Sequence, residues 1–228
     1  GQVGISLRTD PSASNCQGCI EVKLFRRGDT LPLSEVLPML EHMGLRVVTE
    51  HPYDVRVENE QFSIQDLEVR AGEGAILDEQ GIGYFTEAFE RVWHGELEND
   101  GFNRLVLAAG LRWKQVQMLR AYCKYLMQVG VPFSQSYVEA TFARYPLLAR
   151  LLVEYFEARF DPATGKATPA FDRKALADAI NAAAAGKGKA VDADKLPPMQ
   201  YQRDADGSLL ARGGHGDFRC DADGCSAL

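Results

Sequence analysis

The amino-acid sequence predicts an α+β chain in which a β-α-β-β domain precedes an all-helical module. Between residues 20 and 69, apolar residues alternate in short runs that turn residues separate, which is typical of strands. Beyond Trp113 they recur every three or four residues, which indicates amphipathic helices. The chain has 228 residues and is 46% hydrophobic, enough to form the cores of one or two domains.

The first strand is expected at residues 21–26, where Val22 and Leu24 share one face. Gly28 and Asp29 then form a turn. A helix follows, with Ser34 as its N-cap and Gly44 as its stop. Its apolar positions are Leu33, Val36, Leu37, Leu40 and Met43.

Further strands are expected at residues 45–49, which 53–57 extend or follow, and at 62–69. A strand, a helix and then strands are the start of a ferredoxin-like unit, in which the helix covers one face of the sheet. A second helix is expected to begin near Gly83. The fourth strand of a complete unit has no visible pattern in the sequence.

The helical module contains a helix from Trp113 that Gly130 ends. Its apolar face is predicted to carry Val116, Leu119, Tyr122, Cys123, Leu126 and Val129. Ser136 and Glu139 have the spacing of a capping box at the start of the next helix, and Pro146 opens another. Lys124 is expected on a solvated face.

The two ends of the chain are polar and rich in turn residues. Residues 1–19 are interpreted as a flexible lead-in, and residues 185–228 as a low-complexity, disordered tail that can bury little apolar surface. The predicted domains between them are an α+β domain at 20–73 and a helical module at 74–184. The chain begins with Gly1 and not with Met, which favours a piece of a larger protein.

Net charge is −7, and the basic residues are scattered, so we expect neither nucleic acid nor a membrane surface as a partner. No apolar run approaches the roughly 20 residues of a membrane helix, and no signal sequence is visible. The five cysteines indicate a reducing cytoplasm. Cys16 and Cys19 form a C-x-x-C motif, and Cys220 and Cys225 form a second, distant pair. We interpret them as unpaired thiols and expect no metal site.

Several blocks of the sequence, in the same order, resemble the large bacterial NAD-specific glutamate dehydrogenases. The blocks are LPLSEVLPMLEHMGLRVV at 31–48 with HPY at 51–53, DGFNRLVL at 100–107, LRAY at 119–122, FSQ at 133–135 and FEARFDP at 156–162. In that family, this region is similar to an ACT-like domain followed by a helical connector, N-terminal to the catalytic core.

The resemblance implies cytoplasmic amino-acid catabolism, in which a homo-oligomer deaminates glutamate oxidatively to 2-oxoglutarate and ammonia with NAD. This segment would have a regulatory or structural role, with the rest of the parent chain and other subunits as partners. After residue 173, the expected continuation toward the catalytic core is not recognisable, so no family feature is carried over there.

No catalytic, NAD-binding or metal site is predicted in this segment. The glycines at 81–83 and 186–188 lack the G-x-G-x-x-G pattern and follow no convincing strand. Asp100 and Asn103 are interpreted as cap residues. Arg104, Arg112 and Arg120 recur every eight residues; we expect them to be solvated, with a contact to another domain as the alternative.

An independent ACT-like amino-acid-sensing or protein-interaction module, without catalysis, is the alternative function. Its candidate ligand site is the turn at Gly28 and Asp29. There a glycine lets the backbone approach a ligand, and the N-terminus of the following helix attracts a carboxylate. An amino-acid effector would be the ligand.

Overall fold

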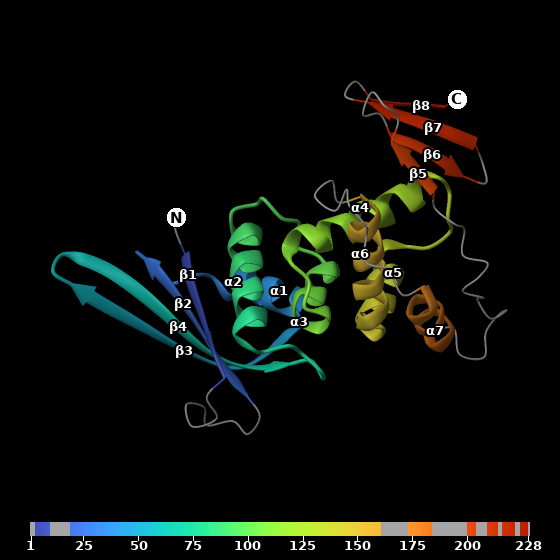
Figure 1. The fold of residues 1–228 in the computed structure, drawn as a ribbon. Coiled ribbons are helices and arrows are strands. Elements are labelled where there is room, and N and C mark those ends of the chain that lie inside the picture. Colours follow the sequence, from blue (N-terminus) through green and yellow to red (C-terminus); the bar gives the residue numbers. More distant parts are fainter. Residues whose placement is uncertain are drawn as a thin grey trace. The chain divides into compact units, whose positions relative to one another are not determined.

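The computed structural model describes residues 3–9, 19–160 and 173–183, and four strands between residues 200 and 227 (Figure 1). Contacts divide the chain into two compact units, Gly1–Pro169 and Ala170–Leu228. Each unit is described by itself.

The first unit begins with an antiparallel sheet of four strands and the two helices that pack on it. The strands are β1 (Val3–Arg8), β2 (Ile20–Arg27), β3 (Leu45–Val57) and β4 (Glu60–Ala71), and the helices are α1 (Leu33–His42) and α2 (Glu79–Trp93). Val22, Leu24, Leu67 and Val69 alternate along the two central strands and are almost completely buried. The α+β class predicted from the sequence is therefore confirmed.

The order of the strands is β1-β2-β4-β3, and β1 was missed by the sequence analysis. Because β2 and β3 are both antiparallel to β4, they run parallel to each other, and α1 is the crossover between them. β1 pairs with the free edge of β2, where the fourth strand of a complete ferredoxin-like unit would lie.

The expectation of a flexible lead-in at 1–19 is wrong for residues 3–8. Val3 and Leu7 are buried, yet they form only a short alternation within a polar segment. The strand is stabilised by its ladder with β2, a partner distant in sequence, and not by a strong local pattern. Residues 10–18 of the expected lead-in lie outside the described residues.

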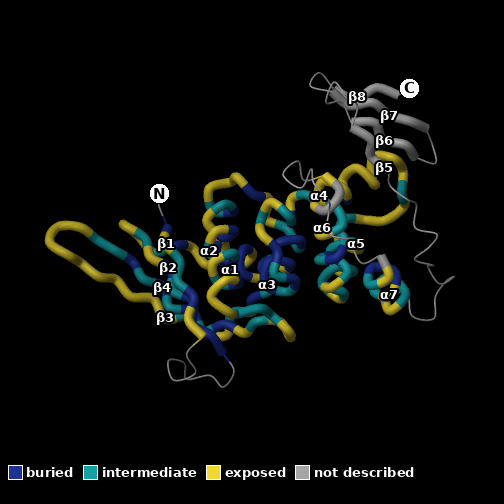
Figure 2. The backbone as a smooth tube through the Cα atoms, viewed as in Figure 1, coloured by how far each residue is buried: buried dark blue, intermediate teal, exposed yellow. Residues whose placement is uncertain are grey.

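The hairpin of β3 and β4 extends beyond the helices and is exposed along most of β3 (Figures 1 and 2). Residues 51–60 are all exposed. The register of β3 against β4 shifts between Val47 and Thr49, a bulge that reverses which side chains of β3 face the helices.

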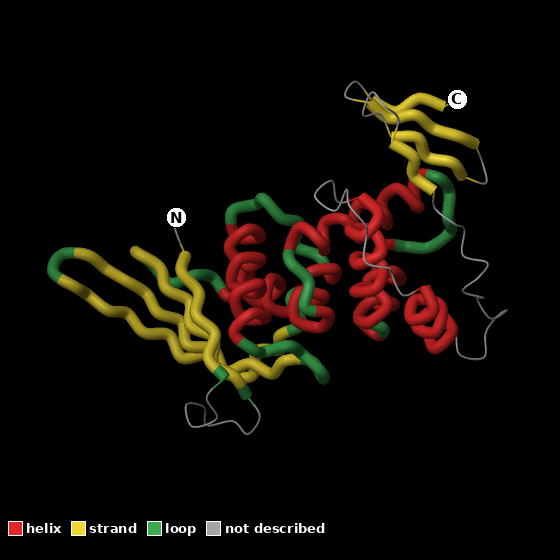
Figure 3. The backbone as a smooth tube through the Cα atoms, viewed as in Figure 1, coloured by secondary structure: helices red, strands yellow, loops and turns green. Residues whose placement is uncertain are grey.

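The helical part of this unit follows α2 (Figure 3). Its elements are the 3₁₀ helix η1 (Gly101–Arg104), α3 (Leu105–Ala109), α4 (Trp113–Gln128), α5 (Gln135–Arg144) and α6 (Pro146–Phe160). One core joins it to the sheet, because Phe85 and Phe89 of α2 belong to the same buried cluster as Phe102 and Leu105. The helical segment expected after the α+β domain is thus present.

The predicted apolar face of α4 is correct for only half of its length. Val116, Leu119 and Cys123 are buried, as expected. Tyr122, predicted on the same face, is 46% exposed, and toward the C-terminal end of the helix Leu126 is 44% and Val129 57% exposed. Helical periodicity predicts which residues share a face, but not how far a neighbouring helix covers that face.

Two predicted helix caps also differ from the structure. The residue that caps α1 is Pro32, which makes no side-chain cap hydrogen bond, and Ser34 lies inside the helix. Ser134, not Ser136, caps α5: its side chain accepts a hydrogen bond from the Tyr137 amide.

The second unit contains α7 (Arg173–Ala183) and a four-stranded antiparallel meander. The strands are β5 (Gln200–Arg203), β6 (Leu209–Gly213), β7 (Gly216–Asp221) and β8 (Gly224–Ala227). The expectation of a disordered tail at 185–228 is therefore wrong for these strands. Short segments between turn residues have little pattern of their own, but each pairs with its neighbour in the meander.

Candidate functional site: a buried arginine network

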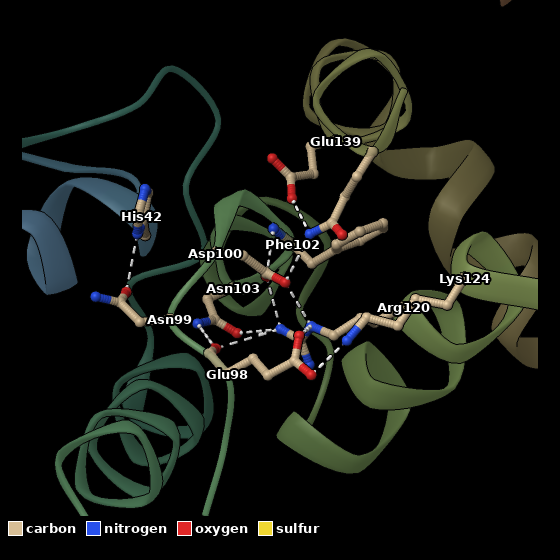
Figure 4. A network of polar contacts seen from close by, with 10 residues as sticks. His42, Glu98, Asn99, Asp100, Phe102, Asn103, Arg120, Lys124 and Glu139 are labelled. Carbon is tan, nitrogen blue, oxygen red and sulfur yellow. Dashed lines mark hydrogen bonds and ion pairs between the residues drawn. The ribbon is translucent and has the colours of Figure 1, made fainter. Parts of the chain in front are cut away.

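A network of polar contacts in the described part of the first unit surrounds Arg120 (Figure 4). Arg120 lies in the middle of α4, on the same buried face as Val116 and Cys123, and is only 3% exposed. Asp100 lies at the N-cap of η1, where its side chain accepts a hydrogen bond from the Phe102 amide. The fold therefore brings a buried guanidinium against a carboxylate that a helix cap already orients.

Arg120 and Asp100 form a bidentate ion pair. Nε of Arg120 donates to Oδ2 of Asp100 at 2.6 Å, and Nη2 donates to Oδ1 at 2.7 Å. Parallel N–H···O bonds of this kind are among the strongest that side chains form. They fix the rotation of α4 relative to the start of η1.

Asn103 and Phe102 of η1 complete the surroundings of the guanidinium. Nη2 of Arg120 donates to Oδ1 of Asn103 at 2.9 Å, and Nδ2 of Asn103 donates to the Glu98 carbonyl at 2.7 Å. Asn103 is completely buried. The guanidinium carbon also lies 5.7 Å from the centroid of the Phe102 ring, close enough for a cation–π contact.

α5 joins the network through Gln135. Its Nε2 lies 3.1 Å from Oδ2 of Asp100 and 2.8 Å from Oε1 of Glu139, and donates to both. Glu139 packs so closely on Gly101 that a Cβ there would lie 2.6 Å from its Oε2. Residues from η1, α4 and α5 are therefore held together at one point.

The network reaches solvent at Glu98 and Lys124, which form an ion pair at the surface. Oε2 of Glu98 also lies 3.7 Å from Nε of Arg120. Lys124 was expected to be solvated; it is half exposed and paired. An exposed pair of this kind contributes little to stability, whereas the buried pair beneath it depends on complete pairing.

The arrangement of the network indicates a structural role. Arg120 directs most of its donors to fixed partners, and only Nη1 is buried without a hydrogen bond. Cys123, one turn further along α4, is buried too, and burial raises the pKa of its thiol. A neutral, buried thiol is a poor nucleophile.

The predicted ligand residues lie elsewhere. Gly28 has a φ of +102°, and its amide donates to the Gln61 carbonyl at 2.8 Å. A Cβ at Gly28 would have no atom within 4 Å, and Asp29 is exposed. The structure does not bring them into the Arg120 network, and their role in binding an effector stays a prediction.

The cysteines correct one expectation. Cys19 is disulfide-bonded and not an unpaired thiol. Cys16 lies outside the described residues, and the backbones of Cys220 and Cys225 are opposite each other in the ladder of β7 and β8. Within the described ranges, no group of three or more histidine, cysteine, aspartate or glutamate residues is placed to hold a metal ion. In the same ranges, no helix is long and apolar enough to cross a membrane.

Sequence reasoning interpreted Arg120 as solvated, although one signal pointed the other way. Arg120 is four residues after Val116 and three before Cys123, so it lies on the predicted apolar face. A charged residue on a buried face requires a partner. Asp100 was identified correctly as a cap residue, whereas Asn103 lies inside η1 and its side chain bonds the Glu98 carbonyl and Arg120. The contact of both residues with α4 depends on the tertiary fold.

The fold and this network define a class of protein segment: an antiparallel α+β domain that shares its core with a helical motif stabilised by a buried ion pair. Two family models match the chain. Residues 2–82 match "Glutamate dehydrogenase, ACT3 domain", and residues 97–162 match "Glutamate dehydrogenase, helical motif 3". The Arg120 network lies completely within the second match.

Curated relatives named NAD-specific glutamate dehydrogenase agree with these matches. The relative from Halomonas elongata is 46% identical over 145 residues, which are 63% of this chain and 9% of the relative. The relative from Mycobacterium tuberculosis is 39% identical over 173 residues, 73% of this chain and 11% of the relative. That from Pseudomonas aeruginosa is 40% identical over 143 residues, 62% of this chain and 9% of the relative.

The chain thus belongs with the large NAD-specific glutamate dehydrogenases, and its two matched regions correspond to their ACT3 domain and helical motif 3. This confirms the resemblance drawn from the sequence. The chain spans about a tenth of the length of these relatives.

Proposed function

We propose that this chain is a regulatory and structural segment of an NAD-dependent glutamate dehydrogenase. The parent reaction is the oxidative deamination of glutamate to 2-oxoglutarate and ammonia. The observation that carries the proposal is the Arg120 network within helical motif 3, because its charged groups are engaged with one another and hold three helical elements together. NAD binds to the parent enzyme outside this segment.

The partners in this proposal are the rest of the parent chain and the other subunits of a cytoplasmic homo-oligomer. The outer face of the sheet supports this. Phe25 and Tyr53 both lie opposite Ile64, and Val55 lies opposite Phe62, so apolar side chains gather on the face that α1 and α2 do not cover. Phe25 is 41% exposed and Tyr53 is 52% exposed. Contiguous exposed apolar patches often mark interfaces.

A second apolar surface lies at the end of α4 and the start of α5. Its exposed members are Tyr125, Leu126, Val129, Phe133 and Tyr137. The rings of Phe133 and Tyr137 stack with their centroids 5.1 Å apart. Exposed aromatic residues are enriched at protein interfaces, so this surface also supports a role in assembly.

An independent ACT-like sensor is the second candidate. In that proposal, the turn at Gly28 and Asp29 binds an amino-acid effector. Gly28 has a positive φ, and a Cβ there would meet no atom within 4 Å, which favours a close approach of a ligand to this turn. Such a module would function without the remainder of a dehydrogenase.

Two measurements test these proposals: the first checks the absence of chemistry that both expect of this chain, and the second separates them. The purified chain, given glutamate and NAD, is expected to produce no NADH; a rate that survives repurification would contradict the assignment of chemistry to another part of the enzyme. In the complete parent enzyme, replacing the residue equivalent to Arg120 by alanine is expected to disturb subunit assembly, measured by light scattering. The equivalent of Lys124→Ala is the control. Unchanged assembly and turnover in the arginine variant would favour the independent module.

A further inference from the structure

A pocket of about 780 Å³ lies between the ACT-like domain and the helical motif, within the first unit. Its walls come from the end of α1, the start of β3, the end of β4, η1 with α3, and the junction of α5 and α6. The charged side chains among them are Glu41, Arg46, Glu73, Arg104 and Arg144. Pockets that hold small molecules commonly have volumes of about 300–1,000 Å³.

The three arginines of this pocket are exposed to solvent. Arg27, Arg91 and Arg120 each form an ion pair with a carboxylate. No such pair is found for Arg46, Arg104 or Arg144 among the described residues, although Glu41 and Glu73 line the same pocket. Three guanidinium groups that line one pocket are therefore available to an anion.

Local structure positions two of these arginines. Gly44 has a φ of +85°, and a Cβ there would lie 3.0 Å from Cγ of Arg104, so the stem of Arg104 crosses directly over the end of α1. The guanidinium carbon of Arg144 lies 5.6 Å from the centroid of the Tyr145 ring. This distance is within reach of a cation–π contact with the ring.

We propose that this pocket binds a small organic anion that carries at least two acidic groups. Three arginines and two glutamates give the lining a net charge of about +1 at neutral pH. Arginine binds carboxylate and phosphate groups bidentately, so acidic groups at opposite ends of a ligand would engage different guanidinium groups. Glu41 and Glu73 disfavour larger polyanions such as nucleic acid.

The pocket lies at the junction of the two matched regions, so a bound ligand would contact both. Arg46 belongs to the ACT-like domain, whereas Arg104 and Arg144 belong to the helical motif. An anion bound by both would cross-link the two regions and stabilise their junction.

The test uses isothermal titration calorimetry on the full 228-residue chain. Malate is the carboxylate probe and inorganic pyrophosphate the phosphate probe, with acetate as the single-acid control. Saturable binding is expected for malate or pyrophosphate, weaker binding for acetate, and loss of affinity as salt is added, because the contacts are ionic. The probe that binds more tightly identifies the acidic group that the pocket prefers.

Arg104→Ala and Arg144→Ala are each expected to weaken binding at least about tenfold, a loss of roughly 1.4 kcal/mol. The control is Arg56→Ala, because Arg56 is an exposed arginine of the β3–β4 hairpin that does not line the pocket. Circular dichroism checks the fold of each variant. If Arg104→Ala is unfolded, the comparison with the control uses Arg144→Ala alone. The proposal is overturned by the absence of saturable binding of both probes, by equal binding of acetate, or by an equal loss in Arg56→Ala.

Discussion

Arg120 of α4 donates to both carboxylate oxygens of Asp100, at 2.6 Å from Nε and 2.7 Å from Nη2, while only 3% of Arg120 is exposed. The pair joins the middle of one helix to the cap of another. Since a buried charge requires its partner, the two residues stabilise helical motif 3 only together.

Arg120→Ala is expected to lower the free energy of unfolding by about 3–5 kcal/mol, because it leaves the Asp100 carboxylate, whose side chain is only 14% exposed, without its ion partner. A urea titration measures the loss. Lys124→Ala, which breaks only the exposed pair with Glu98, is expected to cost less than about 1 kcal/mol.

A double-mutant cycle separates the pair from the rest of the network. Asp100→Ala together with Arg120→Ala is expected to cost clearly less than the sum of the two single changes, because residues in contact are coupled. Additive losses would show that the two side chains contribute independently, and the interpretation of the network as one unit would be wrong.

Leu119→Ala is expected to cost about 2–5 kcal/mol, since Leu119 is 4% exposed and its truncation leaves a cavity. Leu126→Ala on the same helix is the matched control. Leu126 is 44% exposed, so we expect a loss below about 1 kcal/mol. Urea titrations of the two variants compare them directly. Similar losses would mean that another surface covers the end of α4 in solution.

Two glycines of α2 are expected to respond oppositely to alanine. A Cβ at Gly81 would lie 2.3 Å from the Ile76 carbonyl oxygen, a backbone atom that cannot move freely, so Gly81→Ala is expected to lower the melting temperature. A Cβ at Gly83 would meet no atom within 4 Å. Gly83→Ala is therefore expected to stabilise the helix by about 0.5–1 kcal/mol.

Differential scanning calorimetry of both glycine variants provides the measurement. If Gly81→Ala is as stable as the parent chain, the loop that carries Ile76 moves to make room for the new methyl group, in spite of the hydrogen bond from the Ile76 amide to the Leu107 carbonyl. If Gly83→Ala destabilises, the outer surface of α2 packs against something outside the first unit.

The sequence by itself determined the elements whose stability is local. The face of α4 that carries Val116, Leu119 and Cys123 could be predicted because helical periodicity depends only on spacing along the chain. The strands β2, β3 and β4 were predicted for the same reason, from alternation and turn residues. The joint order of several blocks was sufficient to indicate the family.

The tertiary structure alone decided which of these faces are covered and which charges are paired. β1 forms because it can pair with the free edge of β2. Leu126 is exposed because the helices that cover the first part of α4 do not reach it. Arg120 is buried because the fold places Asp100 and Asn103 beside it. Burial and ion pairing depend on residues that are distant in sequence, so no local pattern contains them.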